Sequence, residues 1–167
     1  MKVLGIDPGT KVTGYGIVTS EDGETALVAY GAIAAPERAG IGERLSYIFK
    51  QLDAIIETHR PDVVAVEQPF VAKNARTALA IGRAQAVAIL AAALKDIPTH
   101  EYTPAQVKQR VANYGASRKE QIQEMVRLQL GLSEVPRPDD AADALAVALC
   151  HLQETHLGNL LAGQERR

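Results

Sequence analysis

Residues 2–10 read KVLGIDPGT, and this stretch introduces a pattern that returns twice in the chain. Its first five residues are mostly apolar, as in a strand, and Asp7 stands where the run ends. Pro8 and Gly9 favour a turn, because proline fixes φ and glycine permits positive φ. A carboxylate at the end of an apolar strand predicts an acidic group at the rim of a sheet.

Two more strand-like runs follow after short turns. Residues 13–18 read TGYGIV, and their glycines permit close approach of backbone or ligand. Residues 26–33 are largely apolar, and Asp22-Gly23 between the two runs is a hairpin signal. The three runs together predict an antiparallel meander.

The spacing of apolar residues changes from residue 42 onward. Apolar positions three and four apart predict an amphipathic helix to about His59, and Pro61 ends it. Residues 63–66 read VVAV, which is typical of a strand covered on both faces. This second apolar run also ends in a carboxylate, Glu67.

Helices dominate the remaining sequence. We expect a long alanine-rich helix over residues 75–94, a short strand over 99–102, and a helix capped by Thr103 with proline at its first position. The alanine-rich helix is apolar around much of its circumference, so it needs more cover than one sheet face provides. This favours a homodimer packed on it, although a central core helix in a monomer has the same composition.

Two further helices complete the expected domain. A capping box at 117–120 opens one that ends near Gly131, and the last runs from Pro138-Asp139 to about Gln153. The order of elements predicts an α/β fold with a mixed five-stranded sheet and helices on both faces. We assign residues 1–155 to this domain and residues 156–167 to a polar, flexible tail.

Composition and charge narrow the functional classes. The chain has 167 residues, 47% of them hydrophobic, with a single cysteine, so it fits one globular domain without an intrachain disulfide. The uncharged apolar stretch 86–94 is too short to cross a bilayer, and no signal-peptide pattern opens the chain, so we expect a cytoplasmic protein without membrane contact. Residues 73–127 hold nine Lys or Arg against four Asp or Glu, which permits a basic face but also fits scattered solvated lysines.

The acidic residues form the most informative set. Beside Asp7 and Glu67, the last helix opens with Asp139, Asp140 and Asp143, and the last two are three residues apart, so they share a helix face. Each acid alone has a simpler explanation as a turn, strand-end or helix-capping residue. Their placement at the ends of three apolar elements instead predicts one pocket, in which mutual repulsion favours a bound cation.

All-oxygen, anionic ligands select hard cations. Mg²⁺, with Mn²⁺ as a substitute, therefore suits Asp7, Glu67, Asp140 and Asp143 better than zinc does. Two such ions in one site suit phosphodiester hydrolysis. Asp139 leaves a one-residue ambiguity in the third ligand, which the spacing to Asp143 resolves in favour of Asp140, with Asp139 as the helix cap.

Several motifs of this chain resemble those of the RuvC-type Holliday-junction resolvases. The resemblance rests on GIDPGT at residues 5–10 with TGYG at 13–16, on VEQPFVAKN at 66–74, on QVKQ at 106–109 with the 117–119 region, and on DAADAL at 140–145. These motifs stand in order and at the family's spacing over about residues 2–152. The aspartate-glycine start alone would be weak, because sugar kinases and actin-like ATPases share it.

The resemblance implies a fold, an activity and a set of residues. The fold would be ribonuclease H-like, and a homodimer would nick two strands of like polarity in a four-way DNA junction, in recombination and repair. The family's catalytic, metal-binding carboxylates fall on Asp7, Glu67, Asp140 and Asp143. Its phosphate-binding lysines fall on Lys108 and Lys119, and its aromatic residue near the junction centre falls on Phe70. A branch-migration motor would be a partner.

The residues around these motifs leave other possibilities open. Phe70, Lys73 and Arg76 are candidate DNA contacts, but an aromatic residue after a strand is also an ordinary core residue. Lys108 and Lys119 either hold a phosphate or coat a helix. The alternatives for the whole chain are another ribonuclease H-like nuclease, acting on RNA–DNA hybrids or other branched DNA, and an actin-like ATP-binding protein.

Overall fold

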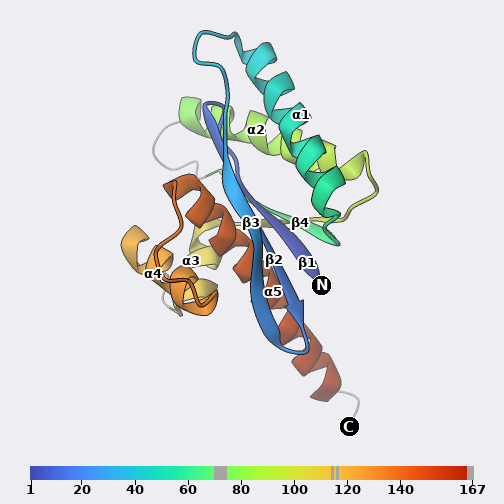
Figure 1. The fold of residues 1–167 in the computed structure, drawn as a ribbon, viewed down its shortest axis with the longest axis vertical. Coiled ribbons are helices and arrows are strands. Elements are labelled where there is room, and N and C mark those ends of the chain that lie inside the picture. Colours follow the sequence, from blue (N-terminus) through green and yellow to red (C-terminus); the bar gives the residue numbers. More distant parts are fainter. Residues whose placement is uncertain (70–74, 114, 116, 165–167) are drawn as a thin grey trace.

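A computed structural model describes residues 1–69, 75–113, 115 and 117–164, and its strands form one mixed sheet (Figure 1). The strands are β1 (Lys2–Asp7), β2 (Val12–Glu21), β3 (Glu24–Ala34), β4 (Val63–Glu67) and β5 (Thr99–Tyr102). Their order is β3-β2-β1-β4-β5, with antiparallel β3-β2-β1 pairing and parallel β1-β4-β5 pairing. The predicted meander and mixed five-stranded sheet are confirmed.

Helices cover both faces of the sheet, as predicted (Figure 1). They are α1 (Ile41–His59), α2 (Ala75–Ala93), α3 (Pro104–Ala112), α4 (Lys119–Gln129) and α5 (Asp139–Gln164). Helices α1 and α2 lie on one face, and α3, α4 and α5 lie on the other. The hairpin predicted at Asp22-Gly23 is present, and both residues have the positive φ that a tight two-residue turn requires.

Three details at helix ends differ from the sequence-based expectations. Helix α5 continues to Gln164 instead of ending near Gln153, because residues 154–164 contain no proline and the helix extends past the sheet. The first residue of α5 is Asp139, so Asp139 is not its cap. Helix α4 is capped one residue later than expected, since the Gln121 side chain accepts a hydrogen bond from the Arg118 backbone N–H at 2.8 Å. The division at residue 155 stays a prediction.

Strand alternation gives the molecule two cores, one on each face of the sheet. On β1, Val3 belongs to the core under α5, whereas Leu4 and Ile6 belong to the core under α1 and α2. On β4 the same alternation sends Val63 to the α5 side and Val64 to the other. Because side chains alternate along a strand, every second residue after Val3 on β1 and after Val63 on β4 also faces α5.

Glycines in β1 and β2 let α5 lie directly on the sheet. A Cβ at Gly5 would stand 2.1 Å from the carbonyl oxygen of Ala144, and a Cβ at Gly16 would stand 2.6 Å from the Leu145 side chain. At Gly14 the corresponding contact is 1.9 Å from the carbonyl oxygen of Asp140. Only glycine fits at these positions, so the glycines set the depth of α5 above the sheet.

Helix α2 packs less completely than α5. Its buried residues are mostly alanines, whereas Leu79 and Leu90 remain more than half exposed. Among the described residues, α2 is the one helix that is long and apolar enough to span a membrane, by length and composition alone. Only one-third of this apolar segment is buried inside the molecule, and the helix contains Arg76 and Arg83.

Candidate active site

The carboxylates of Asp7 and Glu67 are placed by neighbouring strand ends. In the parallel ladder Ile6 pairs with Val66, so the next residues of β1 and β4, Asp7 and Glu67, lie side by side where both strands end. Strand alternation puts both side chains on the face that α5 covers. The predicted meeting of the two carboxylates at one rim of the sheet follows from this pairing.

Helix α5 brings the remaining two carboxylates to the same rim. Gly14 pairs with Asp7 across the β1–β2 ladder, and the backbone of Asp140 packs against Gly14. Asp143 lies one turn further along α5, on a face shared with Asp140. The glycine contact therefore determines that the first turn of α5, and no later one, stands beside Asp7.

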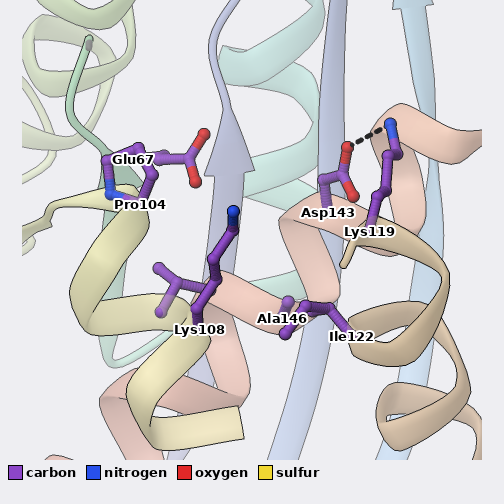
Figure 2. Close-up of a pocket in the computed structure, with 8 residues that line it drawn as sticks. Glu67, Pro104, Lys108, Lys119, Ile122, Asp143 and Ala146 are labelled. Atoms are coloured by element: carbon purple, nitrogen blue, oxygen red, sulfur yellow. Dashed lines mark ion pairs between the residues drawn. The ribbon is translucent and has the colours of Figure 1, made fainter. Parts of the chain in front are cut away.

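A pocket of about 210 Å³ opens next to these groups (Figure 2). Glu67 and Asp143 lie on opposite sides of it, and Lys108 reaches from α3 toward the space between them. Lys119, from the start of α4, approaches Asp143 from the other side. Residues predicted from separate motifs thus line one cavity.

The pKa shifts of Asp7 and Glu67 reflect how close the four carboxylates lie to one another. Burial raises the pKa of Asp7, and the negative charges of the other three carboxylates raise it further. Burial, followed by the charge of Asp143, also raises the pKa of Glu67. Lys119 opposes both increases, and Lys108 opposes the increase at Glu67. The site therefore carries more negative charge than its own lysines neutralise.

Asp139 and Asp140 differ in their surroundings. Asp139 forms ion pairs with Arg137 and, at 3.6 Å, with Lys119. Burial alone would raise the pKa of Asp139, but the charges of Lys119 and Arg137 outweigh it and the pKa is lowered. Asp140 instead contributes to the raised pKa of Asp7. This contrast supports Asp140, and not Asp139, as the member of the acidic set.

The donor chemistry fits a hard divalent cation, although the side chains are not arranged around one. Within the described residues no group of three or more His, Cys, Asp or Glu is close enough to hold a metal ion directly. In its place the Lys119 ammonium lies 2.8 Å from an Asp143 carboxylate oxygen. Clustered carboxylates with raised pKa values are nevertheless the set that a cation stabilises.

The other predicted DNA contacts are only partly covered by the structure. Phe70 and Lys73 lie outside the described residues. Arg76 lies in the first turn of α2 and lines a second pocket together with Asp140. Sequence reasoning did not find Arg137, whose pairing with Asp139 is invisible without coordinates. It also missed the apolar wall of the first pocket, formed by Val107 and Ile122.

Comparison with known proteins identifies the family of the chain. Residues 3–151 match the sequence model of the family described as crossover junction endodeoxyribonuclease RuvC. A protein of that name from Dehalococcoides mccartyi is 54% identical over 162 residues, covering 97% of each chain. Another from Syntrophomonas wolfei is 47% identical over 172 residues, covering 99% of this chain and all of the relative.

A solved structure has the same fold. The structure described as T. thermophilus RuvC in complex with a Holliday junction substrate superposes with a TM-score of 0.89 at 35% identity. The match covers 95% of this chain and 96% of that one. The ribonuclease H-like fold is therefore confirmed, and on the sequence matches above this chain belongs to the RuvC family of crossover junction endodeoxyribonucleases.

Proposed function

We propose that the chain resolves four-way DNA junctions in recombination and repair, by paired nicks in two strands of like polarity that require a divalent cation. The observation that carries the proposal is the convergence of Asp7, Glu67, Asp140 and Asp143 at one rim of the sheet, with raised pKa values at the first two. Binding DNA phosphates gains nothing from converging negative charge, so the cluster favours catalysis over simple binding.

The proposed ligands of the cation are these four carboxylates. Mg²⁺, or Mn²⁺ in its place, and two ions per site fit oxygen-only ligands and would supply an activated water and stabilisation of the leaving oxygen. The carboxylates hold the charge that such ions balance, and one of them accepts the proton of the attacking water. Lys119 is the present counterion of Asp143 at 2.8 Å, so its ammonium is positioned to turn toward a phosphate.

Lys108 is the second proposed phosphate-binding residue. It lines the first pocket beside Glu67, and no ion pair engages it within the described part of the chain. A backbone phosphate entering the pocket would meet Lys108 on one side and Lys119 on the other (Figure 2). Both lysines then position the scissile group against the carboxylates.

We infer a homodimer formed through α2. Exposed apolar residues of this helix fall on one face at Leu79, Ala86, Leu90 and Ala93, together called the α2 stripe. Their spacing of seven, four and three residues keeps them in line along the helix. The exposed Arg83 lies on the same face. Exposed leucines are costly in water, and a two-fold contact would bury Leu79 and Leu90. A dimer also supplies the two cleavage sites that one junction needs.

The surroundings of the proposed enzyme follow from its substrate. An enzyme that acts on DNA junctions would work in the cytoplasm, and a dimer contact would cover the apolar face of α2 without a membrane. A branch-migration motor stays a proposed partner that the resemblance alone implies. An enzyme for RNA–DNA hybrids and an actin-like ATP-binding protein are not favoured by the family match or by the nearly complete coverage of the relatives.

The test is cleavage of a synthetic four-way junction compared with linear duplex of the same sequence. We expect symmetric nicks in the junction with Mg²⁺, none with EDTA, and none in the duplex. Asp7→Asn should bind the junction and cut it slower by orders of magnitude. The matched control is Asp96→Asn at the far end of the sheet, where Asp96 has positive φ, which asparagine adopts readily. Rapid cleavage by Asp7→Asn would refute the proposed mechanism.

A further inference from the structure

A second, larger pocket adjoins the carboxylates on the side away from Lys108 and Lys119. It measures about 710 Å³, and its lining includes Gly9, Thr10, Lys11, Arg76, Thr77 and Asp140. It shares no described lining residue with the first pocket. Asp140 lines this second pocket and Asp143 lines the first, so the α5 carboxylates separate the two.

The loop that forms one wall of the second pocket is held rigidly. The buried Thr13 hydroxyl donates a hydrogen bond to the Gly9 carbonyl at 2.7 Å and accepts one from the Gly9 N–H at 3.3 Å. A Cβ at Gly9 would lie 2.2 Å from the carbonyl oxygen of Val12, so the turn is as tight as glycine permits. The Ala35 N–H donates to the Lys11 carbonyl at 2.8 Å. Thr10 and Lys11 are therefore fixed beside the end of β1.

The chemistry of the walls favours an anion. Lys11 and Arg76 contribute positive charge, and Thr10 and Thr77 contribute hydroxyl groups. Lys11 is exposed and forms no ion pair with any described residue. The lining also includes the amino-terminal part of α2, where the helix dipole is positive. Asp140 is the one carboxylate in this described lining, against the two cations, so the lining carries net positive charge. Cations, hydroxyls and a helix start together match a phosphate group.

We propose that this second pocket binds a backbone phosphate of the DNA strand next to the scissile one, with Lys11 and Thr10 as its ligands. The inference rests on the proposed function, because it takes the strand to cross the carboxylates from the first pocket to the second. Gripping the strand on both sides of the cut holds the scissile phosphate in register with the carboxylates. Lys11 is thus a positioning residue and contributes affinity without sequence preference.

The experiment removes the positive charge of Lys11 and the negative charge of single DNA phosphates, first separately and then together. Binding to a four-way junction is measured in EDTA with wild type, Lys11→Ala and the control Lys50→Ala, which removes the same charge from an exposed site on α1. Single phosphates on either side of the cleavage position are replaced, one at a time, by neutral methylphosphonates. Thermal unfolding of each variant establishes that Lys11→Ala folds like wild type.

We expect Lys11→Ala and one methylphosphonate substitution to weaken junction binding by similar factors. Lys11→Ala should weaken binding by about 3–10-fold and flatten the dependence of log affinity on log salt by about 0.7–0.9, the effect of one lost phosphate contact. One methylphosphonate should weaken wild type by a similar factor and weaken Lys11→Ala by a smaller one, because only the Thr10 contact remains in that variant. Lys50→Ala should behave like wild type.

Other results overturn the inference in distinguishable ways. If wild type cuts the junction but Lys11→Ala matches Lys50→Ala in affinity and salt dependence, the second pocket has no phosphate and the proposed function stands. If wild type neither binds nor cuts the junction, both proposals fail together. If ATP displaces the junction from wild type and its binding depends on Lys11, the pocket takes a free nucleotide and not the DNA backbone.

Discussion

Helices α2 and α5 are both alanine-rich and apolar, yet they are buried to very different degrees. Every residue of α5 from Ala144 to Leu152 is buried, because the sheet covers one side and α3 and α4 cover the other (Figure 1). Helix α2 has the sheet and α1 on one side only, and Leu79 and Leu90 stay exposed at 58% and 51%. Apolar composition thus shows that a helix needs cover but not whether the cover comes from its own chain.

The two faces also differ in function. The α5 face carries the four carboxylates, and its packing determines their positions. The α2 face carries no carboxylate on the helix itself, and its exposed stripe is the proposed contact with a second copy. Changes beneath α5 should therefore damage both stability and cleavage, whereas changes on the α2 stripe should leave the fold stable and act through assembly.

The largest effect is expected from Gly5→Ala, which inserts a methyl group between the sheet and α5. The new Cβ would meet backbone atoms of Ala144 and Ala148 at 2.1 and 2.7 Å, and backbone cannot rotate away as a side chain can. We expect a loss of about 3 kcal/mol or more in the free energy of unfolding, at the upper end of overpacking effects. Displacement of α5 should also abolish junction cleavage.

The control for this substitution lies in the same helix. Gly158→Ala on α5 places its Cβ in open space, and alanine is the better helix former by roughly 0.5–1 kcal/mol. Urea unfolding and cleavage assays of both variants make the comparison. Wild-type stability in Gly5→Ala would show that α5 is not seated on the sheet as described.

The next effect is a contrast between the same substitution on the two helices. Leu145→Ala removes a fully buried side chain and should cost about 2–5 kcal/mol through lost burial and the cavity left behind. Leu79→Ala removes one that is 58% exposed and should change stability by no more than about 0.5 kcal/mol where the chain is monomeric. Denaturant titrations at low protein concentration measure both, and equal costs would remove the distinction between the helices.

A smaller effect is expected when charge is placed on the α2 stripe. Leu90→Glu should leave the fold intact but raise the dimer dissociation constant by at least about tenfold, since two-fold symmetry introduces the charge twice. Leu128→Glu, on α4, alters a leucine of similar exposure, 55%, outside the stripe. Sedimentation or light scattering across a concentration series reports the dimer. A stable dimer in Leu90→Glu, or a monomeric wild type, would contradict assembly through this helix.

The contrast between the helices also shows how far the sequence could be interpreted. The runs that end in Asp7 and Glu67 were predictable, because strand alternation and the parallel ladder depend on local patterns of apolar residues. The sequence did not allow us to predict which of the two helices the rest of the chain would enclose. The alanine-rich composition pointed to α2 as the helix that needs the most cover, yet α5 is the one that its own chain encloses. That outcome depends on glycines in β1 and β2, whose partner helix lies over a hundred residues away.

The site shows the same limit at finer scale. Spacing predicted that Asp140 and Asp143 share a face of α5, but it could not predict that the two residues line different pockets. Contacts between helix starts, such as Lys119 with Asp143, join residues from different motifs and leave no trace in either motif. Helix ends are also weakly encoded, and α5 continues past residue 153 because nothing there breaks it.

The smallest effect concerns proton binding, which distinguishes the two helices as well. Helix α2 has only arginines among its titratable groups, whereas the buried part of α5 contains His151. Its ring lies 2.7 Å from the Tyr102 hydroxyl at Nδ1 and 4.7 Å from the His100 ring between centroids. Burial, followed by the charge of His100, lowers the pKa of His151 to about 4.

The sign of the pH effect follows from this shift. An unfolded histidine has a pKa of about 6.5, so between pH 6.5 and 4 the unfolded chain binds a proton that the folded chain does not. The free energy of unfolding should therefore fall as the pH falls through this window, by about 1 kcal/mol from pH 6.5 to 5.5. In His151→Asn, which keeps a hydrogen-bonding side chain near the Tyr102 hydroxyl but does not titrate, this part of the slope should vanish. Identical slopes in the two proteins would mean that the pKa of His151 is the same in the fold as in the unfolded chain, and that α5 is less completely enclosed than its burial indicates.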